Sequence, residues 1–184
     1  MKIVSIDIGI INLGMVCAEV TWGNIVVEDV HLVDITKSCR HINCTLNHTN
    51  HMVDRIDHFI QEYKHVLDKA DKILVEKQPI QGLISVEQLL FDRLRDRVIF
   101  IHPVSMHKHF NIRNLSYDER KEYLVLKTKT YLEGTLYDKV ERKHDIADAM
   151  AMIIYWRRNA GPRVHREMGK PGTPFDKFLY IPDK

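Results

Sequence analysis

Three apolar runs near the start of the chain predict three β-strands. Residues 3–8 are almost entirely apolar, which is typical of a buried strand. Residues 13–20 and 25–33 also have strand character, and the Trp-Gly-Asn sequence at 22–24 between them favours a turn. Because strands joined by short connections pair with their neighbours, we expect an antiparallel three-strand meander.

The rest of the sequence predicts helices that alternate with strands. Apolar residues recur at intervals of three and four from position 53 to 67, as on the buried side of an amphipathic helix. Ser116 and Glu119 have the spacing of a capping box, which marks the start of a helix. In chain order, the elements predicted after the meander are a helix at 53–67, a strand at 72–75, a helix at 85–95, a strand at 98–101, and helices at 116–132 and 143–159.

This order, β-β-β-α-β-α-β-α-α, predicts an α/β fold. A meander followed by strand–helix units implies a mixed five-stranded sheet, with parallel later strands and helices on both faces. A length of 184 residues fits one domain, which we place at residues 1–160. Residues 161–184 contain four of the six prolines and several basic residues, and we expect an extended or partly disordered tail.

Composition narrows the class of protein. The hydrophobic content of 45% is that of an ordinary globular protein, and a net charge of +2 is small for a protein that coats nucleic acid. Three cysteines argue against a disulfide scaffold and for a reducing compartment. The first residues carry an acid within their apolar stretch, unlike a signal peptide, and no apolar run reaches the roughly 18 residues of a membrane span. We therefore expect a soluble intracellular protein.

Four acidic residues lie where the pattern predicts burial. Asp7 and Glu76 belong to apolar strands, and Asp145 and Asp148 share one helix face because three positions separate them. Each has an ordinary alternative: Asp7 as a turn or cap residue, Glu76 as a partner of Lys77 or another neighbour, and Asp145 as an acid favoured at a helix N-terminus. Together, four carboxylates make an oxygen-only cluster of the kind that suits Mg²⁺ or Mn²⁺.

Three segments around these acids resemble the RuvC-type Holliday junction resolvases. They are Ile-Asp-Ile-Gly-Ile-Ile-Asn-Leu-Gly at 6–14, Val-Glu-Lys-Gln at 75–78 and His-Asp-Ile-Ala-Asp-Ala at 144–149, and the most similar branch is that of the poxviruses and other large DNA viruses. The resemblance covers roughly residues 1–158. It implies an RNase H-like fold, a homodimer, cleavage of four-way DNA junctions, and a location where viral or host DNA is replicated, in the cytoplasm or nucleus. It also implies two Mg²⁺ or Mn²⁺ ions in each active site, bound by the catalytic residues Asp7, Glu76, Asp145 and Asp148.

The resemblance further implies a catalytic lysine and a basic DNA-binding surface. Lys121 is the first candidate for the lysine near the scissile phosphate, and Lys108 is the second. Because phosphate contacts dominate affinity for DNA, basic residues of the second half of the chain are candidates for the DNA surface. Each could equally be a solvated side chain; the predicted DNA-binding residues are Lys108, Lys121, Lys127 and Arg157.

The apolar side chains of the helix at 85–95 have two interpretations. They include Leu89, Leu90, Phe91 and Leu94. Packing in the core is the ordinary one. The family resemblance adds the alternative that part of this surface forms a two-fold dimer interface, which would place two active sites on one symmetric junction.

A loop at 35–51 is longer than the bacterial resolvase pattern leads us to expect. It is rich in cysteine and histidine in the arrangement C-x-H-x2-C-x3-H, and soft or borderline ligands of this kind suit a structural, tetrahedral Zn²⁺. The spacing matches no standard zinc finger, and a histidine-rich loop can arise without a metal. The candidate zinc ligands are Cys39, His41, Cys44 and His48.

Three rival functions remain open at this point. The Asp-x-Gly-x-x-Asn start also resembles the first phosphate loop of actin-like ATPases and sugar kinases, but that architecture needs a far longer chain. A non-catalytic, zinc-stabilised DNA-binding module would leave the buried acids unexplained. A nuclease that acts on RNA or RNA–DNA hybrids would share the fold and the metal centre, because substrate choice lies in surface shape.

Overall fold

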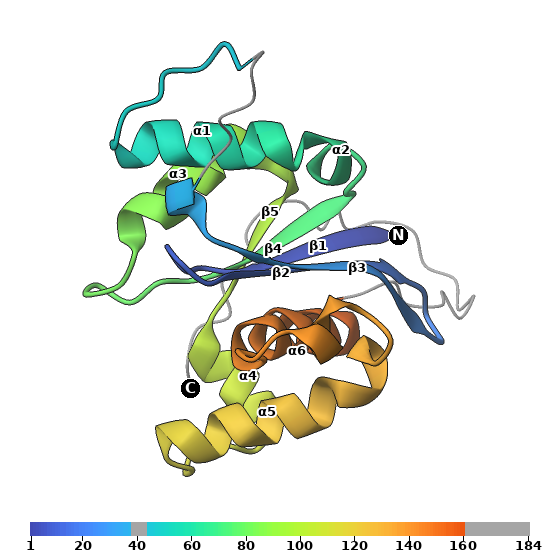
Figure 1. Cartoon of the computed structure of the whole chain (residues 1–184). Helices are drawn as coiled ribbons and strands as arrows, with labels where there is room; N and C mark the ends of the chain where they lie inside the picture. Colours follow the sequence, from blue (N-terminus) through green and yellow to red (C-terminus); the bar gives the residue numbers. More distant parts are fainter. Residues whose placement is uncertain (38–43, 161–184) are drawn as a thin grey trace, which may run out of the picture.

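Five strands form one mixed sheet in the computed structural model, which describes residues 1–37 and 44–160 (Figure 1). The order across the sheet is β3-β2-β1-β4-β5. The first three strands pair antiparallel, whereas β4 is parallel to β1 and β5 is parallel to β4. The meander and the parallel extension are therefore confirmed. The strands are β1 (Lys2–Asp7), β2 (Leu13–Val20), β3 (Ile25–Val33), β4 (Lys72–Glu76) and β5 (Val98–Ile101).

Helices cover both faces of this sheet, as the sequence predicts (Figure 1). One face packs against α1 (Met52–Glu62), α2 (Lys64–Leu67) and α3 (Ile84–Leu94). The other packs against α4 (Pro103–His109), α5 (Tyr117–Leu132) and α6 (His144–Asn159). Short 3-10 turns lie at Ile35–Lys37, Arg95–Arg97 and Leu136–Lys139. Within the two described ranges, every helix is too short or too polar to cross a membrane.

One predicted helix is interrupted, and one helix was not predicted. The helix predicted at 53–67 is interrupted at Tyr63, which leaves the α-helical conformation, although the local sequence has neither proline nor glycine to mark the break. The seven-residue helix α4 was not predicted. Pro103 follows the predicted strand at 98–101 and occupies the first turn of α4, where its missing N–H is tolerated. The predicted tail at 161–184 lies outside the described residues.

The capping box at the start of α5 is confirmed. The Ser116 side chain accepts a hydrogen bond from the backbone N–H of Glu119, and the Ser116 N–H donates to the Glu119 carboxylate at 2.7 Å. Reciprocal bonds of this kind satisfy backbone donors that a helix start otherwise leaves unpaired. They fix where α5 begins and therefore which of its residues face α6.

Helix α6 lies close to the sheet at Gly14, and several of its buried residues are small. Ala147, Ala149 and Ala151 are all fully buried. On β2, Gly14 faces the first turn of α6, and a Cβ atom at this position would lie within 3 Å of the Asp145 carbonyl group. The first turn of α6 can therefore approach β1 and β2 only because position 14 lacks a side chain.

Replacing Gly14 with alanine is expected to lower the melting temperature, because the added methyl group would collide with the backbone of α6. Overpacking of this kind costs about 1–3 kcal/mol, which corresponds to roughly 3–10 °C in a domain of this size. Thermal unfolding followed by circular dichroism measures the shift. Gly23→Ala in the β2–β3 turn is the matched control, because a Cβ there meets nothing within 4 Å. Equal melting of the two variants would contradict the close contact.

Candidate metal centre

Strand alternation directs Asp7 and Glu76 to the same face of the sheet. Val4 and Ile6 of β1 pack toward α1 and α3, so the odd-numbered residues of this strand face α6. In β4, Val75 packs toward α1 and α3, so Glu76 also faces α6. Because β1 and β4 are adjacent and parallel, their carboxyl ends bring the two acids together.

Helix α6 adds the other two acids to this edge. Asp145 and Asp148 lie in its first two turns, on one face, and are 6% and 8% exposed, while Asp7 is 8% exposed. Contacts of α6 with β1, β2 and β4 place that face over the strand acids. The structure therefore brings all four predicted acids to one place, from two strands and one helix.

The four carboxylates are like charges that lie close together and are largely shielded from water. Burial raises the pKa of Asp7 well above its usual value, and the nearby carboxylates of Asp148 and Glu76 raise it further. Burial is also the largest cause of the raised pKa values of Glu76 and Asp148, even though a hydrogen bond from Gln78 and the charge of Lys121 act in the opposite direction. The protein's own cations thus leave the negative charge only partly compensated.

Two cations contact the acids of α6. The Lys121 ammonium group, on α5, donates a hydrogen bond to Oδ2 of Asp148. Burial lowers the pKa of Lys121, but the adjacent Asp148 carboxylate outweighs it and raises this pKa overall. The Arg142 Nε group donates to Oδ2 of Asp145 at 2.6 Å, and His144 lies 3.6 Å from the other oxygen of that carboxylate.

Glu76 does not pair with Lys77, the ordinary alternative that the sequence left open. Lys77 forms its ion pair with Glu87 of α3 instead, and the same carboxylate accepts a hydrogen bond from the Gln78 backbone at 2.6 Å. These bonds fix the segment after β4. The Gln78 side chain, held there, donates to Oε2 of Glu76 at 2.7 Å and orients it toward the other acids.

The donor set fits divalent cations that prefer oxygen ligands. Four carboxylates supply only oxygen atoms, and their partly uncompensated charge is what a bound Mg²⁺ or Mn²⁺ ion would neutralise. The residues that would hold such ions are Asp7, Glu76, Asp145 and Asp148. This assignment stays a prediction, supported by the convergence of the four side chains.

The remaining predicted site residues lie at varied distances from this centre. Lys127 is exposed on α5, one and a half turns beyond Lys121. Lys108 lines an open hollow of about 390 Å³ together with Asn111, Arg113 and Asn114. Arg157 lies at the far end of α6 from the acids, where it donates to the Trp22 carbonyl at 3.1 Å. The DNA-binding roles of these residues stay predictions.

Several residues of the centre were missed from the sequence. Arg142 comes directly before the predicted helix, and its spacing of three from Asp145 is a usable signal for an ion pair. Gln78 was part of the motif but received no role.

For the candidate zinc ligands, Cys44 and His48 lie close together, whereas Cys39 and His41 fall outside the described residues. His58, from α1, completes that cluster and was not predicted.

The chain is similar to known proteins in structure and not in sequence. No family model matches the sequence, and no curated protein sequence matches it significantly. Solved structures do match. The fowlpox virus Holliday junction resolvase aligns with a TM-score of 0.62 and 15% identity over 86% of this chain and 99% of its own. A structure of the fowlpox virus resolvase with its substrate, Holliday junction DNA, also gives 0.62, at 18% identity over 86% and 97%.

Two further solved structures share this fold. The yeast mitochondrial Holliday junction resolvase has a TM-score of 0.59 and 15% identity over 85% of this chain and 78% of its own. RuvC of Thermus thermophilus has a TM-score of 0.50 and 19% identity over 86% and 96%. At these identities the likeness is one of fold. The chain has the RNase H-like fold of RuvC-type resolvases, and the resemblance to the poxvirus branch is confirmed at that level.

Asp7→Asn is expected to raise the melting temperature of the metal-free protein, because it removes one charge from a buried group of like charges. A gain of about 1 kcal/mol corresponds to roughly 2–4 °C in a domain of this size. Thermal unfolding in EDTA measures this gain. Added Mg²⁺ should stabilise the parent but hardly the variant, because a ligand stabilises only the state that binds it.

The raised pKa of Asp7 also determines how the stability of the metal-free protein should change with pH. Because the pKa of Asp7 is raised, its contribution to stability is full below the unfolded value of about 3.9 and is lost as the pH rises through the folded-state pKa. The parent in EDTA should therefore lose more stability than Asp7→Asn as the pH rises above about 4. Asp96→Asn, at an exposed acid, is the control. Identical pH profiles for Asp7→Asn and the parent would contradict repulsion within the group.

Proposed function

We propose that this chain is a metal-dependent endonuclease that cuts four-way or otherwise branched DNA junctions. The observation that carries the proposal is the gathering of four largely buried carboxylates from β1, β4 and α6. A protein with no use for cations would gain stability by replacing such a group with apolar residues. Buried acids of raised pKa, gathered at the carboxyl ends of β1 and β4, favour a catalytic role.

The residues of the centre would have different roles in phosphodiester hydrolysis. When bound by the four acids, two Mg²⁺ or Mn²⁺ ions would supply an activated water and neutralise charge at the scissile phosphate. Asp7 and Glu76 are held by the sheet, and Gln78 fixes the orientation of Glu76. Because the ligands stand on strands and a helix, their positions are more precise than loop residues would allow.

Lys121 would bind the phosphate as a cation. Its ammonium group lies beside Asp148. The Lys121 side chain is 23% exposed, so a substrate can reach it. The neighbouring carboxylate keeps this group protonated, so it would donate hydrogen bonds to phosphate oxygens and would not act as a general base. Arg142, beside Asp145 and about half exposed, is a second cation in reach of the same substrate face.

The substrate class is supported by the fold and by the chemistry together. The fowlpox virus resolvase, whose fold this chain shares over 86% of its length, is known in complex with Holliday junction DNA. A four-way junction has two-fold symmetry, so a homodimer would place one active site on each of two symmetric strands. Phe91 of α3, which is 41% exposed and stacks with Phe100 of β5, is our candidate for that dimer interface.

Cleavage of a labelled four-way DNA junction in Mg²⁺ tests the proposal directly. We expect the parent to make paired, symmetric nicks in the junction and to leave linear duplex and RNA–DNA hybrid largely intact. Asp145→Asn should lower the rate by more than about 100-fold, because even the outer partners of metal ligands are worth 10–100-fold. Circular dichroism of the variant serves as the folding control.

The other outcomes of that assay distinguish the rivals. Cleavage of the hybrid but not of the junction would retain the metal centre and overturn the substrate. A folded parent that binds junctions and cuts nothing in Mg²⁺ or Mn²⁺ would favour the non-catalytic DNA-binding module.

Lys121→Ala is expected to lower the cleavage rate at saturating DNA by about 10²–10³-fold, the usual cost of removing one pre-positioned donor from a developing charge. Lys127→Ala is the matched control, because Lys127 lies on the same helix but is exposed and farther along. It should weaken DNA binding slightly and leave that rate unchanged. If both variants lose only affinity, Lys121 is a DNA contact and has no part in the chemical step.

A further inference from the structure

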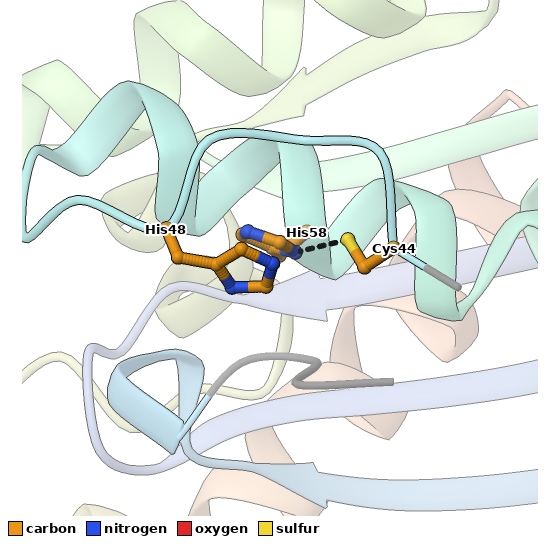
Figure 2. Close-up of side chains that lie close together, drawn as sticks. All are labelled: Cys44, His48 and His58. Atoms are coloured by element: carbon orange, nitrogen blue, oxygen red, sulfur yellow. Dashed lines mark hydrogen bonds between the residues drawn. The ribbon is translucent and has the colours of Figure 1, made fainter. Parts of the chain in front are cut away.

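Three metal-ligating side chains meet on the face of the sheet opposite the acids. Cys44 and His48 come from the segment before α1, and His58 comes from α1 itself (Figure 2). One ligand atom from each lies within 4.8 Å of the others. His58 is only 2% exposed, whereas His48 is exposed, so the cluster joins a buried helix residue to a surface segment.

The Cys44 and His58 ligand atoms have the spacing of two ligands of a tetrahedral metal site. The Cys44 Sγ atom lies 3.5 Å from His58 Nδ1. Zinc bonds of about 2.3 Å to sulfur and about 2.05 Å to nitrogen, at a tetrahedral angle, place those two atoms about 3.6 Å apart. The two imidazole rings are close as well, with centroids 4.5 Å apart, and Figure 2 shows both beside the thiol.

A backbone hydrogen bond prepares His58 for this role. Its Nε2 atom lies 2.9 Å from the Asn47 carbonyl oxygen. A carbonyl can only accept, so Nε2 must carry the proton, and in the neutral ring the lone pair then resides on Nδ1, which faces Cys44. Metal-binding histidines are commonly held in one tautomer by such a bond.

We propose that Cys44, His48 and His58 bind a structural Zn²⁺ ion that fastens residues 44–51 to α1. One thiolate and two imidazoles are soft and borderline ligands, which favour Zn²⁺ over Mg²⁺. Solvent at the exposed side of His48 supplies the fourth ligand. The ligand set differs from the one expected from the sequence. His58 lies outside the loop, on α1, and comes close to Cys44 and His48 only in the folded chain.

Metal analysis of the full-length protein, purified without a histidine tag and dialysed after saturation with Zn²⁺, tests the proposal. We expect about one Zn²⁺ per chain that excess Mg²⁺ does not displace. His48→Ala should abolish this binding while the chain stays folded, because His48 is exposed. Cys44→Ser should do the same. His51→Ala, at an exposed histidine of the same segment that is not in the cluster, should retain the ion.

Cobalt reports the ligands directly. Reconstitution with Co²⁺ should give a sulfur-to-metal charge-transfer absorption in the parent and in Asp145→Asn, and none in Cys44→Ser. A parent that holds less than about a tenth of an equivalent of Zn²⁺ would overturn the proposal and leave a thiol–imidazole hydrogen bond in its place. Retention of Zn²⁺ by both His48→Ala and Cys44→Ser would overturn it too, by locating the ion elsewhere. Because Asp145→Asn is part of the set, failure here is distinguishable from failure of the nuclease proposal.

Discussion

The mutual repulsion of four carboxylates is the constraint around which the rest of the structure is arranged. Asp7, Asp145 and Asp148 are each less than a tenth exposed, so water screens them poorly. Lys121 and Arg142 offset part of this repulsion from outside the group. The surrounding fold holds the acids together against the remaining repulsion, and local instability of this kind is common at functional sites.

The close packing of α6 is what allows the acids to meet. A helix with large residues at this interface would stand farther from the sheet, and Asp145 and Asp148 could not approach acids at strand ends. The absent side chain at Gly14 lets the backbone of the first turn of α6 approach β2 closely. The apolar packing and the polar centre are therefore one feature, because the same residues that bury the helix also set the positions of its carboxylates.

Much of the fold and of the centre could be predicted because both follow from short-range rules. Strand alternation directs Asp7 and Glu76 to one face, and a spacing of three places Asp145 and Asp148 together. The pairing of Lys77 with Glu87 could not be predicted in the same way, because it depends on where α3 packs. The break at Tyr63 and the short helix α4 likewise depend on tertiary contacts, which override local propensity. His58 shows the same limit, since a ligand from a helix joins a loop motif only after folding.

The sheet also separates the two proposed metal sites. The acids lie on the face covered by α6, and the Cys44–His48–His58 cluster lies with α1 on the other (Figures 1 and 2). Transition metals generally bind nitrogen and sulfur ligands more tightly than Mg²⁺ does, whereas carboxylates alone discriminate less. The four acids of the other face offer only oxygen ligands, which suit Mg²⁺ or Mn²⁺ better than a set containing a thiolate does. If both proposed sites bind metal, the chain would hold a structural ion on one face of the sheet while its acids exchange hard cations on the other.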